Sequence, residues 1–375
     1  MHAGKVGMIP LRSPILAGIF VMLPRFKAAA VHAAPVFLDS RATTEKAIAI
    51  MREAARAGAE LIAFPETYIP AFPVWAALWP PIDNHDLFVR MAEQSVLVDG
   101  PEVARLCAEA RGLGVTVSIG ISERSAVSVG GLWNSNLLIG ETGEILAHHR
   151  KLVPTFYEKL VWSSGDGAGL KVAETRQGRI GALICGENTN PLARFALMAQ
   201  GEQVHISSWP PMWPTRRPAG GGNFDNVAAN RIRASAHCFE AKVFGIVTAG
   251  YMDQPMRTFL IERDRTIADV IDQTPRAASF FVDPTGSVFG DELQDHEGIA
   301  YAEIDLNRCV EPKQFHDVVG YYNRFDIFGM TVDRSRLTPA RFRDEEQPIA
   351  KAQDEAILSI DAGAVSNGQR RDCRS

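Results

Sequence analysis

The stretch 179–208, RIGALICGENTNPLARFALMAQGEQVHISS, has the pattern of a strand, a helix and a second strand. It opens with an apolar run of strand length, and 204–208 is a second such run. Between them, 191–200 has helical spacing, with Asn190 as candidate N-cap and Gly201 as the stop. Because two buried strands joined by a helix normally pair in parallel, the stretch predicts an α/β domain.

The same alternation extends on both sides of this stretch. Buried strands are predicted at 27–33, 60–64, 115–121 and 243–249, helices at 41–56, 102–111 and 226–242, and β-hairpins at 134–149 and 278–289. Strands, helices and hairpins in this order indicate a mixed α/β fold. The pattern alone fits a simple doubly wound sheet as well as a sandwich of two sheets.

The composition is that of an ordinary globular chain. The 375 residues are 46% hydrophobic, and 39 basic against 44 acidic side chains give a net charge of −5. This balance argues against a disordered chain and against the concentrated basic surface of a nucleic-acid-binding protein. No P-loop, G-x-G-x-x-G or G-x-S-x-G motif occurs. The usual support for an NTPase, a dinucleotide-binding protein or a serine hydrolase is therefore missing.

The cysteines are odd in number, widely spaced and without a C-x-x-C pair. They indicate neither a disulfide framework nor a zinc site, so a reduced, cytoplasmic protein is expected. They are Cys107, Cys185, Cys238, Cys309 and Cys373.

Both ends of the chain are expected to lie outside the main domain, which is placed at 26–310. Residues 1–25 contain an apolar run, 14–24, that is too short to span a bilayer. A disordered or extended segment is expected there rather than a signal peptide, and no membrane association is expected. Residues 311–375 form a C-terminal extension whose polar end is expected to be disordered.

Three reactive side chains follow apolar strands. Glu66 comes after LIAFP, Lys151 after EILAHHR, and Cys185 ends RIGALIC. Because ligands of open α/β sheets bind beyond the carboxyl ends of strands, these residues are candidates for a cysteine-nucleophile hydrolase without histidine. Each has a plainer interpretation in isolation: a loop acid, a solvated basic turn and an inert core cysteine. The spacing from Lys151 to Glu158 is uninformative, because Pro154 interrupts a helix there.

Three ordered motifs together resemble those of the nitrilase superfamily of carbon–nitrogen hydrolases. They are 59–66 (AELIAFPE), 149–155 (HRKLVPT) with Glu158 beyond it, and 185–188 (CGEN). The resemblance covers about 26–333. Three motifs in this order are far more specific than any one of them.

Within that superfamily the chain is similar to the nitrilase branch. Glu187 stands two residues after the motif cysteine, where the related aliphatic amidases typically carry an aspartate. The segments 155–170 and 320–326 are also similar to nitrilase segments. Ser163 and Ala71 depart from the pattern, since glycine is common at both places, and both departures are expected to affect substrate choice.

The resemblance implies a four-layer α-β-β-α sandwich. It also implies a Glu–Lys–Cys triad, with Glu66 as proton acceptor, Lys151 as charge stabiliser and Cys185 as nucleophile, and Glu158 as a second glutamate. No metal or organic cofactor is implied. The implied partners are a small-molecule nitrile, water and further copies of the chain, in dimers and in the spiral homo-oligomers that nitrilases often form, with contacts from the C-terminal extension.

The implied reaction is hydrolysis of a nitrile to the carboxylic acid and ammonia through a thioimidate and a thioester. Phe72, Trp75, Trp162 and Trp209 are interpreted as pocket residues that suit an aromatic or arylaliphatic nitrile, with core packing as the alternative for each. An amidase-like or cyanide-converting enzyme remains open, as does, from a different class, a catalytically silent binding or scaffold protein.

Overall fold

The computed structural model describes residues 22–340 and residue 342. By the contacts between its residues, the chain divides into two units, 1–336 and 337–375. The fold below is that of the first unit. Most of the predicted N-terminal extension and the end of the chain from residue 343 lie outside the described residues.

The first unit contains two six-stranded sheets. Sheet A has the strand order β12-β1-β2-β3-β4-β5, and sheet B has the order β11-β10-β9-β8-β7-β6. The strands of sheet A are β1 (Arg25–His32), β2 (Ala59–Ala63), β3 (Thr116–Arg124), β4 (Leu132–Ile139), β5 (Ile145–Arg150) and β12 (Gly298–Asp305). The strands of sheet B are β6 (Ala173–Thr175), β7 (Gly178–Ile184), β8 (Val204–Trp209), β9 (Phe244–Ala249), β10 (Ser279–Val282) and β11 (Val288–Leu293).

Helices and short 3₁₀ turns connect these strands. The α-helices are α1 (Ser40–Arg56), α2 (Trp75–Leu78), α3 (His85–Gln94), α4 (Pro101–Leu113), α5 (Pro191–Met198), α6 (Asn226–Ala241), α7 (Gln254–Arg263), α8 (Ala268–Gln273) and α9 (Val310–His316). The 3₁₀ turns are η1 (Pro81–Asp83), η2 (Phe156–Leu160), η3 (Gly167–Gly169), η4 (Cys185–Thr189), η5 (Pro218–Gly220), η6 (Arg265–Ile267) and η7 (Leu306–Cys309).

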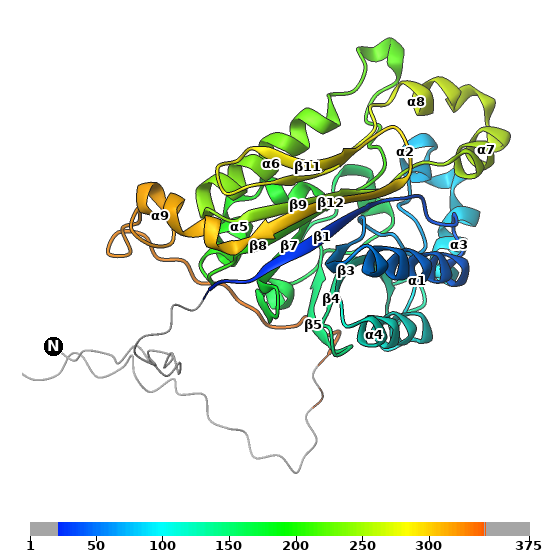
Figure 1. Cartoon of the computed structure of the whole chain (residues 1–375). Coiled ribbons are helices and arrows are strands. Elements are labelled where there is room, and N and C mark those ends of the chain that lie inside the picture. Colours follow the sequence, from blue (N-terminus) through cyan, green and yellow to red (C-terminus); the bar gives the residue numbers. More distant parts are fainter. Residues whose placement is uncertain (1–21, 341, 343–375) are drawn as a thin grey trace, which may run out of the picture. The chain divides into compact units, whose positions relative to one another are not determined.

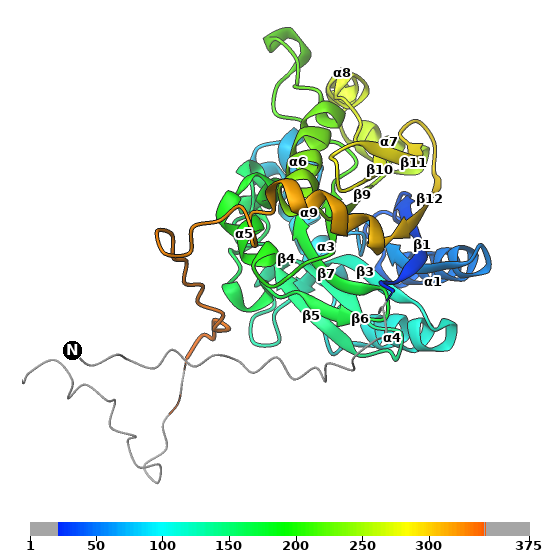
Figure 2. The ribbon, with the colours of Figure 1, turned by 60° about the vertical axis from the view of Figure 1, so that its left-hand side comes forward.

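The sheets and helices form four layers. Strand β1 shows why: Ala28 and Ala30 pack between the two sheets, whereas Ala29 and Val31 pack against the layer that contains Met51 of α1. Helices α1 and α4 cover sheet A, and α5 and α6 cover sheet B (Figures 1 and 2). The predicted α-β-β-α sandwich is therefore confirmed, and the simple doubly wound sheet is not the fold.

The predicted hairpins and parallel units are present. Strand β4 pairs antiparallel with β5, and β10 with β11, while β7, β8 and β9 pair in parallel. The side chain of Asn190 accepts hydrogen bonds from Leu192 and Ala193 at the start of α5, so the predicted N-cap is confirmed.

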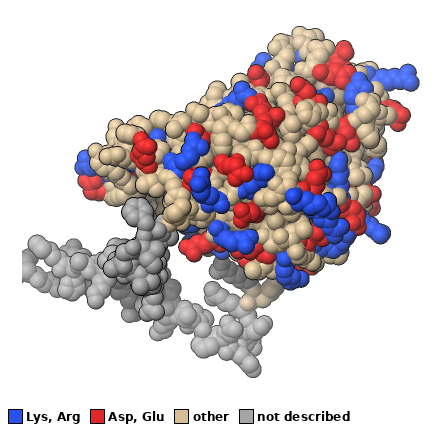
Figure 3. Space-filling model, viewed as in Figure 1, with Lys and Arg blue, Asp and Glu red and all other residues tan. Residues whose placement is uncertain are grey.

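None of the helices in the described ranges is long and apolar enough to cross a membrane. On the face that Figure 3 shows, basic and acidic side chains are interspersed over the surface. That mixture differs from the single-sign patch that a nucleic-acid surface usually requires.

Candidate active site

The carboxyl ends of three strands bring the candidate residues together. Strand β5 runs parallel to β2 and β3, because β3, β4 and β5 alternate in direction, so β2 and β5 end at the same edge of sheet A. Glu66 follows β2, and Lys151 directly follows β5. Cys185 directly follows β7 in sheet B. An oxygen of Glu66, an oxygen of Glu158 and the sulfur of Cys185 lie within 4.8 Å of one another.

Two glycines let the supporting loops approach the sheet. A Cβ on Gly120 of β3 would lie 2.3 Å from the nitrogen of Thr67 and 2.4 Å from the oxygen of Pro65, the two neighbours of Glu66. A Cβ on Gly165 would lie 2.7 Å from the oxygen of Lys151. A side chain at either position would displace the loop that carries Glu66 or Lys151, so glycine is needed at both positions.

The ammonium of Lys151 lies between two carboxylates in the buried centre of the site. Its Nζ is 2.8 Å from Oε1 of Glu66 and 2.6 Å from Oε2 of Glu158, and all three side chains are fully buried. Asn134 donates to Oε1 of Glu66 at 2.7 Å, and the backbone N–H of Thr155 donates to Oε2 of Glu158 at 3.0 Å. Oε2 of Glu66 has no hydrogen-bond partner within the described residues, so one lone pair is free to accept a proton.

The electrostatics of this cluster leave the thiol protonated and supply a base. Burial, together with the charge of Glu66, raises the pKa of Cys185 well above its usual value. Burial also raises the pKa of Glu66 to about 7, and the charge of Lys151 opposes that rise. Burial alone would lower the pKa of Lys151, but the neighbouring negative groups raise it well above its usual value. A base near neutrality is suited to remove the thiol proton.

The turn η4, which carries Cys185, has a strained backbone that its neighbours hold in place. Cys185 has φ of 50°, a left-handed conformation that costs a non-glycine residue about 1–3 kcal/mol. The carboxylate of Glu187 accepts from the backbone of Ile184 at 2.9 Å and of Leu152 at 2.6 Å, and from His149 at 2.9 Å. The hydrogen bonds of Glu187 therefore hold the loop after Lys151 against η4, the turn that carries Cys185.

A cavity, partly open to solvent, lies beside Cys185. Its walls include Trp209, Trp213 and Phe224, and Arg233 of α6 also lines it. Aromatic walls with few polar groups are typical of a small-molecule pocket.

The four predicted pocket aromatics divide into two groups. Trp209 lines the cavity beside Cys185. Phe72, Trp75 and Trp162 are not among its lining residues. They belong to a buried cluster against which Trp213 also packs, and in which the ring of Phe72 lies 5.8 Å from that of Trp162. The indole nitrogen of Trp162 donates to Ser122 at 3.0 Å, a contact that fixes the ring within the core.

Several site residues have no signal in the sequence. Asn134 lies within a hairpin strand, and its hydrogen bond to Glu66 depends on pairing across sheet A. Tyr157 is buried next to the triad, and its hydroxyl lacks a hydrogen-bond partner within the described residues. Arg233 and Trp213 reach the cavity from elements far along the chain. Hydrophobic periodicity cannot locate such residues.

Comparison with known proteins places this fold and site in a family. The model of the carbon-nitrogen hydrolase family matches residues 27–314. An aliphatic nitrilase of Rhodococcus rhodochrous is 35% identical over 320 residues, which cover 84% of each chain. A bromoxynil-specific nitrilase of Klebsiella pneumoniae subsp. ozaenae is 34% identical over 83% of this chain and 86% of its own.

A solved structure agrees with the fold. Saccharomyces cerevisiae Nit3, a member of branch 10 of the nitrilase superfamily, superposes with a TM-score of 0.60 at 18% identity and covers 78% of this chain and 94% of its own. The chain belongs to the carbon–nitrogen hydrolase family. Within that family its similarity over most of its length is to nitrilases, which confirms the enzyme class expected from the three motifs.

Proposed function

We propose that this enzyme hydrolyses an organic nitrile to the carboxylic acid and ammonia, with Cys185 as nucleophile, Glu66 as proton acceptor and Lys151 as the cation that stabilises developing charge. The observation that carries the proposal is the ammonium of Lys151, held between Glu66 and Glu158 next to a protonated thiol. A thiol with an adjacent base and a fixed cation is the set of groups that covalent catalysis on a nitrile carbon needs.

The reaction proceeds through two covalent intermediates. Glu66 accepts the thiol proton while sulfur bonds to the nitrile carbon, and the proton passes to nitrogen to give a thioimidate. Water, deprotonated by Glu66, adds to the same carbon, and the amine leaves as ammonia after protonation, which gives a thioester. A second water adds, the carbon–sulfur bond breaks, and the carboxylic acid leaves. Lys151 stabilises the charge that develops on nitrogen or oxygen in each addition.

Ammonia release from a small substrate panel tests this function. The panel contains phenylacetonitrile, benzonitrile, a short aliphatic nitrile, cyanide and phenylacetamide, with acid and amide products separated. Ammonia from a nitrile, with acid as the main product, is expected. Ammonia from the amide alone would make the protein an amidase, and turnover of cyanide alone would make it a cyanide-converting enzyme.

The pH dependence of kcat/KM follows from the ionisation of Glu66. Its pKa is raised to about 7, so Glu66 is protonated below that pH and cannot accept the thiol proton. We expect kcat/KM to rise about tenfold per pH unit up to about pH 7 and then to level off. Initial rates at low nitrile concentration between pH 5 and 9 measure this limb. A limb centred near the ordinary carboxyl value would contradict the role of Glu66.

Substitution of the cavity aromatics is expected to change substrate preference. Trp213→Ala widens the cavity beside Cys185, and we expect the kcat/KM ratio of phenylacetonitrile to a short aliphatic nitrile to change by about tenfold. Phe281→Leu is the control, since Phe281 is buried between the two sheets and does not line the cavity. An unchanged ratio in Trp213→Ala, or an equal change in both variants, would show that this cavity does not bind the substrate.

We further propose that the enzyme forms homo-oligomers and works in the cytoplasm. Within 311–336, the side chains of Tyr321, Tyr322 and Phe328 are exposed, as expected for a segment that contacts other copies of the chain. Cys107, Cys185, Cys238 and Cys309 are all free thiols, which suits a reducing compartment.

A further inference from the structure

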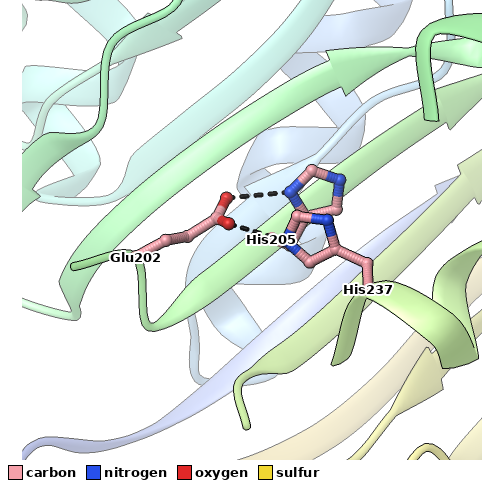
Figure 4. Close-up of side chains that lie close together, drawn as sticks. All are labelled: Glu202, His205 and His237. Carbon is pink, nitrogen blue, oxygen red and sulfur yellow. Dashed lines mark hydrogen bonds and ion pairs between the residues drawn. The ribbon is translucent and has the colours of Figure 1, made fainter. Parts of the chain in front are cut away.

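A second cluster of buried titratable side chains lies behind the nucleophile turn. Glu202 accepts from Nδ1 of His205 at 2.8 Å and from Nε2 of His237 at 2.7 Å. Figure 4 shows the carboxylate beside the two rings and pointing toward a nitrogen of each; the rings are stacked with their centroids 3.7 Å apart. The three side chains come from the turn before β8, from β8 itself and from α6. The proposed reaction uses none of them.

The cluster reaches the nucleophile through Asn188 of η4. The amide nitrogen of Asn188 donates to the backbone oxygens of Cys185 at 3.0 Å and Leu183 at 3.3 Å. Carbonyl oxygens only accept hydrogen bonds, so these contacts fix which end of the amide is nitrogen. The amide oxygen then faces Nε2 of His205 at 2.8 Å, and that ring nitrogen must donate.

Both ring nitrogens of His205 face hydrogen-bond acceptors. Nδ1 lies 2.8 Å from the carboxylate of Glu202, and Nε2 lies 2.8 Å from the amide oxygen of Asn188. Burial would raise the pKa of Glu202, but the neighbouring histidines lower it to about 2, so its carboxylate is ionised and accepts only. His205 therefore links the carboxylate of Glu202 to the amide of Asn188.

We propose that His205, held by Glu202, is a positioning residue for the nucleophile and acts through Asn188 on the backbone oxygen of Cys185. The expected effect on turnover rests on the proposed function. The expected effect on the reactivity of the Cys185 thiol does not.

The backbone of Cys185 explains why such support is needed. Its φ of 50° is disfavoured for a residue with a side chain, and it persists only where surrounding contacts determine it. Two hydrogen bonds from one amide fix the carbonyls on either side of Ile184. The side-chain amide of Asn188 could rotate if nothing donated to its oxygen. The donor to that oxygen therefore decides whether the hydrogen bonds to the backbone oxygens of Leu183 and Cys185 survive. Nε2 of His205 is the donor that faces this oxygen, at 2.8 Å.

Three conservative variants separate this role from general stability. In His205→Asn the amide nitrogen replaces Nδ1, so the contact with Glu202 survives and the contact with Asn188 is lost. In His205→Gln the amide nitrogen replaces Nε2, so the contact with Asn188 survives and the contact with Glu202 is lost. His237→Asn loses a contact with Glu202, and His237 makes no hydrogen bond to η4 within the described residues, so it is the matched control.

We expect His205→Asn to lower kcat for the preferred nitrile about a hundredfold with KM within about twofold, the scale of a misplacement of about 1 Å. His205→Gln and His237→Asn should keep kcat within about threefold, since each variant keeps a hydrogen-bond donor to the side-chain oxygen of Asn188. All three should lower the melting temperature. A kcat loss that follows the melting temperature across the three variants would overturn the proposal.

The alkylation rate of Cys185 with iodoacetamide, followed on its peptide by mass spectrometry, gives a readout that needs no substrate. We expect His205→Asn alone to change this rate by about tenfold or more, and that result would sustain the proposal even if no nitrile were turned over. An unchanged rate would overturn it. One possible metal-ligand atom from each of Glu202, His205 and His237 lies within 4.8 Å of the other two. Loss of turnover on dialysis against a chelator, restored by zinc, would therefore overturn the proposal in favour of a metal site.

Discussion

Replacement of Cys185 by alanine is expected to abolish nitrile turnover and to leave the fold intact. Loss of a covalent nucleophile lowers kcat by roughly 10⁴- to 10⁶-fold, because no other group in the site can form the bond to carbon. The side chain is small and 6% exposed, so its removal leaves only a minor cavity. Ammonia release and the melting temperature, measured on the same preparation, separate the two effects.

Cys309 provides the control for this experiment. It is also a buried free thiol, 3% exposed, but it is the last residue of η7 and packs in the cluster between the sheets. Cys309→Ala should cost stability and keep full turnover. Turnover that survives Cys185→Ala, or that disappears equally in both variants, would be incompatible with Cys185 as nucleophile.

The sequence carries enough information to predict most of the fold and to place Glu66, Lys151 and Cys185 beyond the ends of strands. The apolar runs before Glu66, Lys151 and Cys185 become β2, β5 and β7, and each residue lies just past its strand. Strand ends can be predicted because they coincide with a change from apolar to polar side chains. That two sheets face each other is not encoded in any local pattern, since small residues such as Ala28 and Ala30 pack equally well under a helix or a second sheet.

Contacts that depend on loop geometry could not be predicted from spacing. Pro154 made the separation of Lys151 and Glu158 uninterpretable, and η2 supplies the answer: Thr155 and Glu158 cap one another, which turns the carboxylate back towards Lys151. The sequence likewise does not indicate which aromatic rings line the cavity beside Cys185. In the structure Trp209 lines it, whereas Trp162 packs in a buried cluster.

The missed cluster behind the nucleophile illustrates the same limit. Glu202 and His205 are three residues apart across the start of β8, a spacing that has no special meaning in a strand. Their partner His237 comes from α6, where its ring meets the cluster only after the helix packs on sheet B. Long-range packing of this kind creates buried polar networks without a sequence motif.

Replacement of Lys151 by methionine is expected to remove activity and also to destabilise the fold. The ammonium is fully buried and bonded to two carboxylates at 2.6 and 2.8 Å. Methionine fills much of the same volume but leaves Glu66 and Glu158 facing each other without a cation. Loss of one partner from a buried ion pair costs about 3–5 kcal/mol, because the remaining charge is uncompensated. Urea unfolding at pH 8 measures this loss.

The destabilisation should depend on pH in a defined direction. In the native enzyme the pKa of Glu66 is already raised from 4.5 to about 7, and loss of Lys151 removes a charge that opposes this rise. A carboxyl whose folded-state pKa is raised contributes stability below its unfolded pKa and loses it as pH rises through the folded pKa. Lys151→Met should therefore be closest to the wild-type stability near pH 5 and furthest from it near pH 8.

A double variant distinguishes charge balance from catalysis. Glu158→Gln removes one of the two carboxylates, so Lys151→Met combined with Glu158→Gln should recover much of the lost stability at pH 8. Activity should stay absent in the double variant, because no cation remains to stabilise charge on the substrate nitrogen. Recovery of stability without activity would assign Lys151 both a structural and a chemical role. Recovery of turnover along with stability would instead mean that Lys151 only balances the two carboxylates, and the proposed mechanism would lose its charge stabiliser.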